Sequence, residues 1–219
     1  MASRHTMVSE KISDYLEQNF SIEDDFFIQL RKEALNKGFP DISIGGVQAG
    51  FLKFMIKAVQ AERIVEVGSL FGYSALMMAK ALPDHGKIYC FELIPEYAEF
   101  IKEWADKGGL SSKVEVIIGN ALDKLTEFTV EQSVDMVFID ADKPNYSKYL
   151  ELTYPLVRKN GIIIGDNCLA WGLIADDDFD FEPINVRALQ DFNQTMVKHS
   201  QIFSTLIPLG DGMCMGVKV

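Results

Sequence analysis

Cysteine is scarce in this sequence, and long apolar runs are absent. The three cysteines, Cys90, Cys168 and Cys214, lie far apart and form no CxxC pair, which argues against a disulfide framework and a zinc ribbon. Few, unpaired cysteines are typical of a reducing compartment. No stretch approaches the ~20 apolar residues that a membrane span needs, and residues 1–10 lack the apolar centre of a signal peptide. The sequence therefore predicts a cytoplasmic protein with no membrane partner.

Positive charge is outnumbered as well. The chain has 21 Lys and Arg against 32 Asp and Glu, which gives a formal net charge of −11. Because a field of that sign repels polyanions, the sequence predicts no nucleic-acid partner.

Repeats and low-complexity linkers are also absent, and hydrophobic residues make up 48% of the 219 residues. This length and composition suit one domain with a sizeable core and are unlike those of a disordered chain. We expect a single domain over 1–219, with a helical extension at 1–40 followed by an α/β core at 41–219.

Apolar residues recur at helical spacing through the first 37 residues, up to the stop signal Lys37-Gly38-Phe39-Pro40. A loop is predicted at Ile42–Ala49 and a helix at Gly50–Ala61. Farther along, short apolar runs alternate with amphipathic stretches. The runs are Ile64–Val67, Ile88–Phe91, Val114–Ile118, Val134–Ile139 and Ile162–Ile164. The amphipathic stretches are Tyr73–Ala81, Pro95–Lys107, Ala121–Phe128, Tyr146–Val157 and Val186–Lys198.

This alternation predicts the sheet. Continuous apolar strands separated by helices are typical of a parallel sheet with helices on both faces. The last segments, Ile202–Leu209 and Met213–Val219, are joined through Gly210-Asp211-Gly212, a hairpin-type turn. An antiparallel pair is therefore expected at one edge of the sheet.

The end of the first strand carries an acid and two glycines, Glu66, Gly68 and Gly72, just before a predicted helix. Glycines at such a turn let a ligand approach the backbone, and ligands of open α/β sheets bind at the carboxyl ends of strands. The spacing is G-x-x-x-G and not the G-x-G-x-x-G of dinucleotide sites. Glu66 would repel a pyrophosphate but attract a cationic sulfonium or amino group. The second strand ends in Glu92, which suits a ribose diol.

Two later strands also end in acids. Asp140 follows the fourth strand, and Asp166-Asn167 follow the fifth. Neighbouring parallel strands bring these residues to one edge, where two carboxylates and an amide form a hard-oxygen set that suits Mg²⁺. The three histidines of the chain lie elsewhere, which disfavours zinc. Either acid alone would be an ordinary cap or turn residue.

Lys143 follows Asp140 by three residues. A divalent cation beside it and partial burial would favour its neutral amine, which can take a proton from a hydroxyl that the metal has acidified. A surface lysine is the simpler interpretation of this residue taken alone.

These residues resemble the cation-dependent O-methyltransferases, the family of the catechol and caffeoyl-CoA O-methyltransferases. The resemblance extends roughly from Gly45 to the C-terminus. It is carried by Glu66-Val67-Gly68 with Gly72-Tyr73-Ser74, by the segment from Phe138 to Tyr146, by Asp166-Asn167, and by Leu209-Gly210-Asp211-Gly212.

The resemblance implies a fold, a reaction and roles. The fold is a Rossmann-like S-adenosylmethionine-dependent methyltransferase fold with a seven-stranded, mostly parallel sheet and an antiparallel last strand. The implied activity is metal-dependent transfer of a methyl group to a hydroxyl of a small catechol-like or hydroxycinnamoyl acceptor, by a homodimer. The implied cofactor-binding residues are Glu66, Gly68, Ser69, Tyr73, Ser74, Glu92, Ala121 and Asp140. The implied metal ligands, for Mg²⁺, Mn²⁺ or Ca²⁺, are Asp140, Asp166 and Asn167, and the implied catalytic residues are Lys143 as general base and Asp140.

The sequence departs from the family pattern beside the metal ligands. Many members have Leu-Trp after the Asp-Asn pair, whereas this chain has Leu169-Ala170-Trp171, with the aromatic one place later. We expect this shift to reshape the substrate wall.

Three alternatives are compatible with parts of the pattern. A metal-independent S-adenosylmethionine methyltransferase, acting on another small molecule or a protein, would use the same glycine turn and would leave Asp166-Asn167 structural. A non-catalytic cofactor-binding protein would have no need of Lys143. A nicotinamide-dependent oxidoreductase is disfavoured by the glycine spacing.

Overall fold

The computed structural model describes residues 8–130 and 133–219. The start of the predicted extension at 1–40, and most of the segment searched for a signal peptide, therefore lie outside the described residues.

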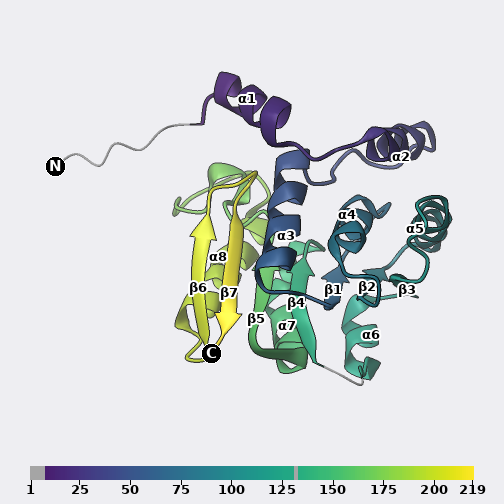
Figure 1. Cartoon of the computed structure of the whole chain (residues 1–219). Coiled ribbons are helices and arrows are strands. Elements are labelled where there is room, and N and C mark those ends of the chain that lie inside the picture. The colour runs from purple at the N-terminus through teal and green to yellow at the C-terminus, as the bar shows by residue number, and fades with distance from the viewer. Residues whose placement is uncertain (1–7, 131–132) are drawn as a thin grey trace.

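Helices and strands alternate along most of the chain (Figure 1). The α-helices are α1 (Glu10–Phe20), α2 (Asp25–Asn36), α3 (Gly46–Ala58), α4 (Tyr73–Ala81), α5 (Pro95–Lys107), α6 (Ala121–Glu127), α7 (Tyr146–Thr153) and α8 (Pro183–Lys198). The strands are β1 (Arg63–Val67), β2 (Lys87–Glu92), β3 (Val114–Ile118), β4 (Val134–Ile139), β5 (Val157–Gly165), β6 (Ile202–Ile207) and β7 (Met213–Lys218). Short 3-10 turns lie at η1 (Lys143–Asn145), η2 (Tyr154–Leu156) and η3 (Ala170–Gly172).

The strands of the described chain form a seven-stranded sheet in the order β3-β2-β1-β4-β5-β7-β6. β1 to β5 are parallel, and β7 runs antiparallel to both β5 and β6. The predicted parallel sheet and the predicted antiparallel pair at one edge are therefore confirmed. The chain runs outward from β1 through β2 to β3 and then returns to β4 on the other side of β1. This reversal between β1 and β4 is the point where open α/β sheets bind their ligands.

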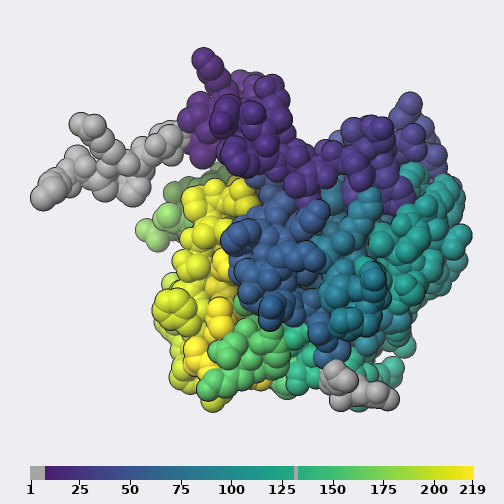
Figure 2. Space-filling model, viewed as in Figure 1, coloured from purple at the N-terminus to yellow at the C-terminus, as the bar shows by residue number. Residues whose placement is uncertain are grey.

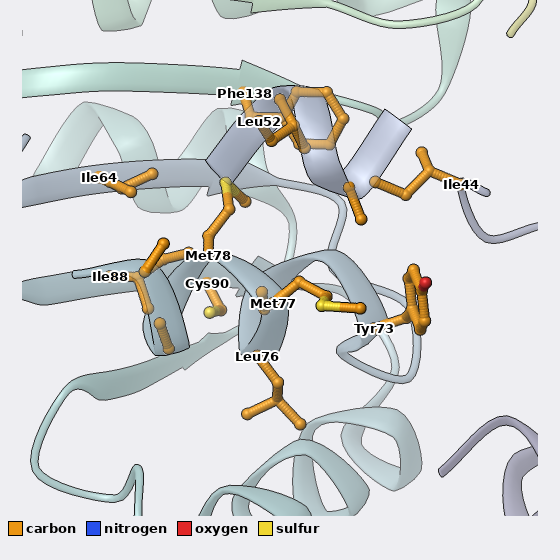
Figure 3. Close-up of a cluster of buried hydrophobic side chains, with 14 of the residues drawn as sticks. Ile44, Leu52, Ile64, Tyr73, Leu76, Met77, Met78, Ile88, Cys90 and Phe138 are labelled. Atoms are coloured by element: carbon orange, nitrogen blue, oxygen red, sulfur yellow. The ribbon is translucent and has the colours of Figure 1, made fainter. Parts of the chain in front are cut away.

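Successive strand residues contribute to opposite faces of the sheet. On β1, Ile64 joins a hydrophobic cluster beneath α2, α3, α4 and α5, whereas Val65 joins a cluster beneath α6, α7 and α8. Figure 3 shows part of the first cluster, where Leu52 of α3 and Met78 of α4 pack with Ile64 and Phe138 from the strands. The side chains of Ile64 and Val65 are fully buried, so both faces of the sheet are covered, as predicted.

Several element boundaries differ from the predictions; the helix predicted at Tyr146–Val157, for example, ends at Thr153. Polar contacts decide three of the others. The predicted N-terminal helix is broken at residues 21–24, where Asp24 caps α2 by accepting from the Phe27 N–H at 3.3 Å. α3 begins at Gly46, inside the predicted loop, because the Gln48 side chain accepts the Gly45 N–H at 3.3 Å. β5 begins at Val157 and not at Ile162, and its polar start is held by an Arg158–Asp135 ion pair of 2.6 Å.

Helix α1 lies at the edge of the fold, where Glu17 near its C-terminal end lies beside the start of α3. Figure 2 shows it projecting from the molecular surface above the sheet, and none of its residues is buried. Among residues 8–130 and 133–219, no helix combines the length and the apolar character that a bilayer crossing requires.

Candidate active site

A cavity of about 740 Å³ opens at the carboxyl ends of β1 to β5, where the strand order reverses between β1 and β4. Every one of these strands contributes a residue at or just after its end. These residues are Gly68 after β1, Glu92 of β2, Gly119 after β3, Asp140 after β4 and Asn167 after β5. The cavity size suits a small-molecule cofactor together with a small substrate.

The turn from β1 into α4 needs its glycines. Gly68 has φ +86°, and a Cβ there would lie 2.4 Å from the Asp140 carbonyl oxygen. Gly72 has φ +87°, and a Cβ there would lie 2.7 Å from the Ile101 side chain. The two glycines therefore allow β4 and α5 to approach the turn, while Gly68 also lines the cavity. The structure thus gives these glycines a packing role, and the predicted approach of a ligand to the backbone stays a prediction.

Glu66 lies directly behind this turn and is fully buried. Its carboxylate accepts hydrogen bonds from the hydroxyls of Ser69 and Ser74, both at 2.5 Å, and both serines line the cavity. Burial raises the pKa of the Glu66 carboxyl to about 7. A cationic group bound in the cavity would compensate the cost of ionising this carboxylate, so the site favours a positively charged ligand.

Glu92 and Ala121 lie farther along the cavity wall. The two oxygens of Glu92 accept the backbone N–H groups of Leu70 at 2.7 Å and Ile94 at 2.8 Å. Both bonds fix the carboxylate at the cavity surface, and each oxygen keeps a lone pair for a ligand hydroxyl. The arrangement suits the ribose diol predicted from sequence.

Tyr73 is buried at the start of α4, and it lines the cavity. The Arg31 guanidinium of α2 lies 3.8 Å from the centre of its ring. Arg31 also donates to the Ser43 hydroxyl at 2.5 Å and to the Ile44 carbonyl at 2.6 Å. Helix α2 thereby holds the segment that closes this side of the cavity, a contribution with no motif in the sequence.

The predicted metal ligands follow two paired strands. Ile139 of β4 pairs with Gly165 of β5, and the next residues along are Asp140 and Asp166. Asp140 and Asn167 line the cavity, whereas Asp166 is buried behind it and accepts from the Gln48 amide at 3.1 Å. Burial, and then the negative charge of Asp140, raise the pKa of the Asp166 carboxyl well above its usual range.

This donor set fits a hard divalent cation. A shared cation would stabilise the ionised form of Asp166 beside Asp140, and oxygen donors are those that Mg²⁺ prefers. In the described part of the chain no group of three or more His, Cys, Asp or Glu side chains gathers as a metal site. The candidate set therefore consists of two carboxylates and one amide.

Lys143 lies at the same end of the cavity, on turn η1. Its ammonium group is 3.0 Å from Asp140 Oδ1 and donates to the Tyr146 hydroxyl at 2.8 Å. Only 13% of the lysine side chain is exposed. The predicted base is thus a mostly buried side chain whose ammonium group contacts the predicted metal ligand Asp140. It is not the solvent-exposed lysine of the simpler interpretation.

The loop after β5 holds an unusual backbone. Asn167, Ala170 and Trp171 have φ values of +58°, +52° and +56°. A left-handed conformation costs a non-glycine residue about 1–2 kcal/mol, least for Asn, so surrounding contacts must hold Ala170 and Trp171 in place. Trp171 lines the cavity with its indole 44% exposed.

The family model for O-methyltransferases matches residues 17–219. The chain belongs to this family. The predicted family and the predicted enzyme class, a SAM-dependent O-methyltransferase, are confirmed. The likeness begins well before Gly45, so our prediction of its extent was too short, and it includes part of α1 and all of α2.

Individual O-methyltransferases align over most of the chain. A catechol O-methyltransferase from Niastella koreensis is 30% identical, over 97% of this chain and 99% of the relative. A probable caffeoyl-CoA O-methyltransferase from Dictyostelium discoideum is 31% identical, over 94% of this chain and 89% of the relative. The crystal structure of an O-methyltransferase from Bacillus cereus in complex with SAH superposes with a TM-score of 0.88 at 25% identity, covering 95% of this chain and 97% of that one.

Several residues of this O-methyltransferase site were missed by sequence reasoning. Arg31, Gln48 and Asp211 contact the cavity segments from helices or turns far away in the chain. Their residue types are common on surfaces, so no pattern distinguishes them. For Asp211 there were two signals: the glycine pair around it, which we interpreted as a turn, and the resemblance of this segment to the family, to which we attached no role.

Proposed function

We propose that this O-methyltransferase transfers the methyl group of S-adenosylmethionine to a hydroxyl of a small catechol-like or hydroxycinnamoyl acceptor, with a divalent cation. The observation that carries the proposal is the group of Lys143, Asp140 and Asn167 on the cavity wall, with the buried Glu66 behind the β1–α4 turn of the same cavity. A base, a hard-oxygen set and a cation-binding carboxylate then share one chamber. The names of the relatives, which include catechol and caffeoyl-CoA O-methyltransferases, agree with this acceptor class.

At the cofactor end, the chain's own residues bind and orient. The ionised Glu66 would bind the amino group of the methionine part, with Ser69 and Ser74 fixing its two oxygens. Gly68 and Tyr73 would shape the wall around it, while Glu92 and Ala121 would hold the ribose and adenine. When bound, S-adenosylmethionine supplies a methyl group on a sulfonium sulfur.

At the acceptor end, Lys143 would remove the proton. As the free amine it would accept the hydroxyl proton at Nζ, and Tyr146, 2.8 Å away, would keep that nitrogen in place. The acceptor oxygen would then bond to the methyl carbon as the carbon–sulfur bond breaks, which leaves S-adenosylhomocysteine. Holding two reactants in line is worth up to about 7–11 kcal/mol of the barrier.

Asp140, Asp166 and Asn167 would hold the divalent cation, Mg²⁺ first and Mn²⁺ or Ca²⁺ as alternatives. Its chemistry would be that of a Lewis acid, which lowers the cost of negative charge on the acceptor oxygen. Gln48 would orient Asp166 through the hydrogen bond to Oδ1.

A panel of phenolic acceptors tests the proposal. The enzyme is incubated with S-adenosylmethionine and each acceptor, with Mg²⁺ or with EDTA, and the mass of the product is measured by mass spectrometry. We expect a one-methyl mass gain on vicinal diols with Mg²⁺ and its loss with EDTA. Equal turnover under both conditions would favour the metal-independent methyltransferase instead, and methylation of a monophenol or a protein would contradict the acceptor class.

We also propose a homodimer that resides in the cytoplasm. Tyr15 and Phe20 on the peripheral helix α1 are more than half exposed, at 57% and 58%. Burying such an apolar surface against a second copy would stabilise both. The sparse cysteines agree with a reducing compartment.

A further inference from the structure

The turn between β6 and β7 is hydrogen-bonded to the strained loop that follows β5. The Leu169 N–H donates to the Asp211 carbonyl at 2.8 Å, and the Cys168 N–H donates to the Gly212 carbonyl at 2.8 Å. A Cβ at Gly212 would lie 2.4 Å from the Leu169 side chain. The two segments are therefore in contact at the backbone level, which only glycine permits at position 212.

The side chain of Asp211 reaches one residue farther. The Trp171 N–H donates to both carboxylate oxygens, at 2.9 and 3.0 Å. Hydrogen bonds to an ionised acceptor are the stronger kind, and this one falls on a residue with φ +56° and ψ +30°. The carboxylate thus opposes the tendency of Trp171 to leave the left-handed region.

Asp211 also faces the predicted catalytic groups. Burial raises the pKa of the Asp211 carboxyl, and the Trp171 N–H, the Lys143 ammonium and the Asn167 amide act in the opposite direction. Trp171 and Asn167 line the cavity, whereas Asp211 does not. Its influence on the cavity must therefore pass through the residues it touches.

We propose that Asp211 is a positioning residue for the acceptor end of the active site: its carboxylate sets the place of the Trp171 indole and the Asn167 amide. The inference rests on the proposed function for its kinetic consequences. Trp171 stands one place later than the aromatic of the family pattern, and its backbone is left-handed, a conformation that a tryptophan rarely adopts. The hydrogen bonds from Asp211 are needed to keep the residue in that conformation.

The first test is Asp211→Asn in protein labelled with 5-fluorotryptophan. The chain has only two tryptophans, Trp104 and Trp171, so each gives its own fluorine resonance. We expect the Trp171 resonance to shift or broaden while that of Trp104, a buried residue of α5, stays in place. Asp178→Asn, an exposed carboxylate of the next loop, removes the same charge and should change neither resonance.

The second test separates the two ends of the cavity. Asp211→Asn should raise the KM for the catechol acceptor, and the dissociation constant of Mn²⁺ measured by paramagnetic resonance, about 10–100-fold, as removal of a ligand-orienting contact does. Calorimetric binding of S-adenosylhomocysteine should change less than about twofold, since the Glu66 end is untouched. A parallel loss at both ends, or no change at the acceptor end, would overturn the proposal.

A second variant guards against misfolding. Ala170→Gly removes the strain of the neighbouring left-handed residue, so in combination with Asp211→Asn it should move the Trp171 resonance back toward the wild-type position. If the resonance does not move back, Asp211 does not position Trp171 by stabilising the left-handed backbone. If the wild-type enzyme methylates no acceptor, the proposed function fails. The fluorine spectra still test whether Asp211 positions Trp171, because they do not depend on activity.

Discussion

Lys143 is the residue on which proton transfer depends in this account. Lys143→Met keeps most of its packing but removes the amine, and we expect kcat to fall about 10²–10⁴-fold because general-base catalysis contributes that much. Binding of S-adenosylhomocysteine should persist. Lys148→Met, at an exposed lysine of the following helix α7, is the matched control. Steady-state rates on catechol measure both, and a Lys143 variant as fast as the Lys148 variant would contradict the assigned role.

Glu66 makes stability and cofactor binding respond to pH in opposite directions. Burial raises the pKa of its carboxyl from 4.5 to about 7 in the fold. The folded protein therefore binds a proton between these values that the unfolded chain releases. The contribution of Glu66 to the free energy of unfolding is fully present below pH 4.5 and is lost as the pH rises through about 7. The loss amounts to about 3 kcal/mol.

The pH prediction has two measurable parts. Thermal unfolding of the ligand-free protein should show a decline between pH 5 and about 7.5 that Glu66→Gln lacks, because the difference between the two proteins isolates this carboxyl. A cationic cofactor needs the ionised form, so its affinity should rise about tenfold per pH unit below about pH 7. Calorimetric titrations at several pH values test this, and a flat affinity profile for the wild type would rule out Glu66 as the partner of the cation.

At the scale of elements, the β1–α4 turn is the most demanding connection. Gly68→Ala forces a methyl group onto the Asp140 carbonyl at φ +86°, so we expect a loss of about 2–4 kcal/mol in the free energy of unfolding. Gly109→Ala, at φ +65° with nothing within 4 Å of its Cβ, should lose only the ~1–2 kcal/mol of left-handed strain. Chemical denaturation of both proteins measures the difference, and equal losses would show that the close approach at Gly68 is unimportant.

The sequence predicts those elements whose apolar pattern is complete. β4 and α5 have the predicted bounds because buried runs and helical spacing extend over their full length. The start of β5 was missed because its exposed Lys159 and Asn160 interrupt the apolar run. The start of α3 was missed because a side-chain cap and not apolar spacing determines it.

The candidate site was predictable where residues end strands. Glu66 lies within an apolar run, and Glu92 and Asp140 directly follow two others, so their common edge follows from the parallel topology. Arg31 and Asp211 were not predictable, because their contacts join segments that are distant in the chain and depend on how α2 and the β6–β7 turn pack.

At the scale of the whole molecule, two hydrophobic clusters cover the sheet, while α1 lies at the edge of the fold with no buried residue. The division into an extension at 1–40 and a core at 41–219 stays a prediction. If α1 belongs to a dimer interface, Tyr15→Ser with Phe20→Ser should shift the light-scattering mass from twice 24.6 kDa toward 24.6 kDa. Val197→Ser, a change at a 66% exposed valine of α8, should leave the mass unchanged. A wild-type protein of 24.6 kDa at micromolar concentration would contradict the dimer.

The meeting of β4 and β5 at one cation beside the methyl donor is the central claim. Anomalous diffraction from a crystal grown with S-adenosylhomocysteine and Mn²⁺ tests it most directly. We expect one peak about 2–2.3 Å from oxygens of Asp140, Asp166 and Asn167, facing the bound sulfur across the cavity. No peak there, or a peak held by other residues, would contradict the account.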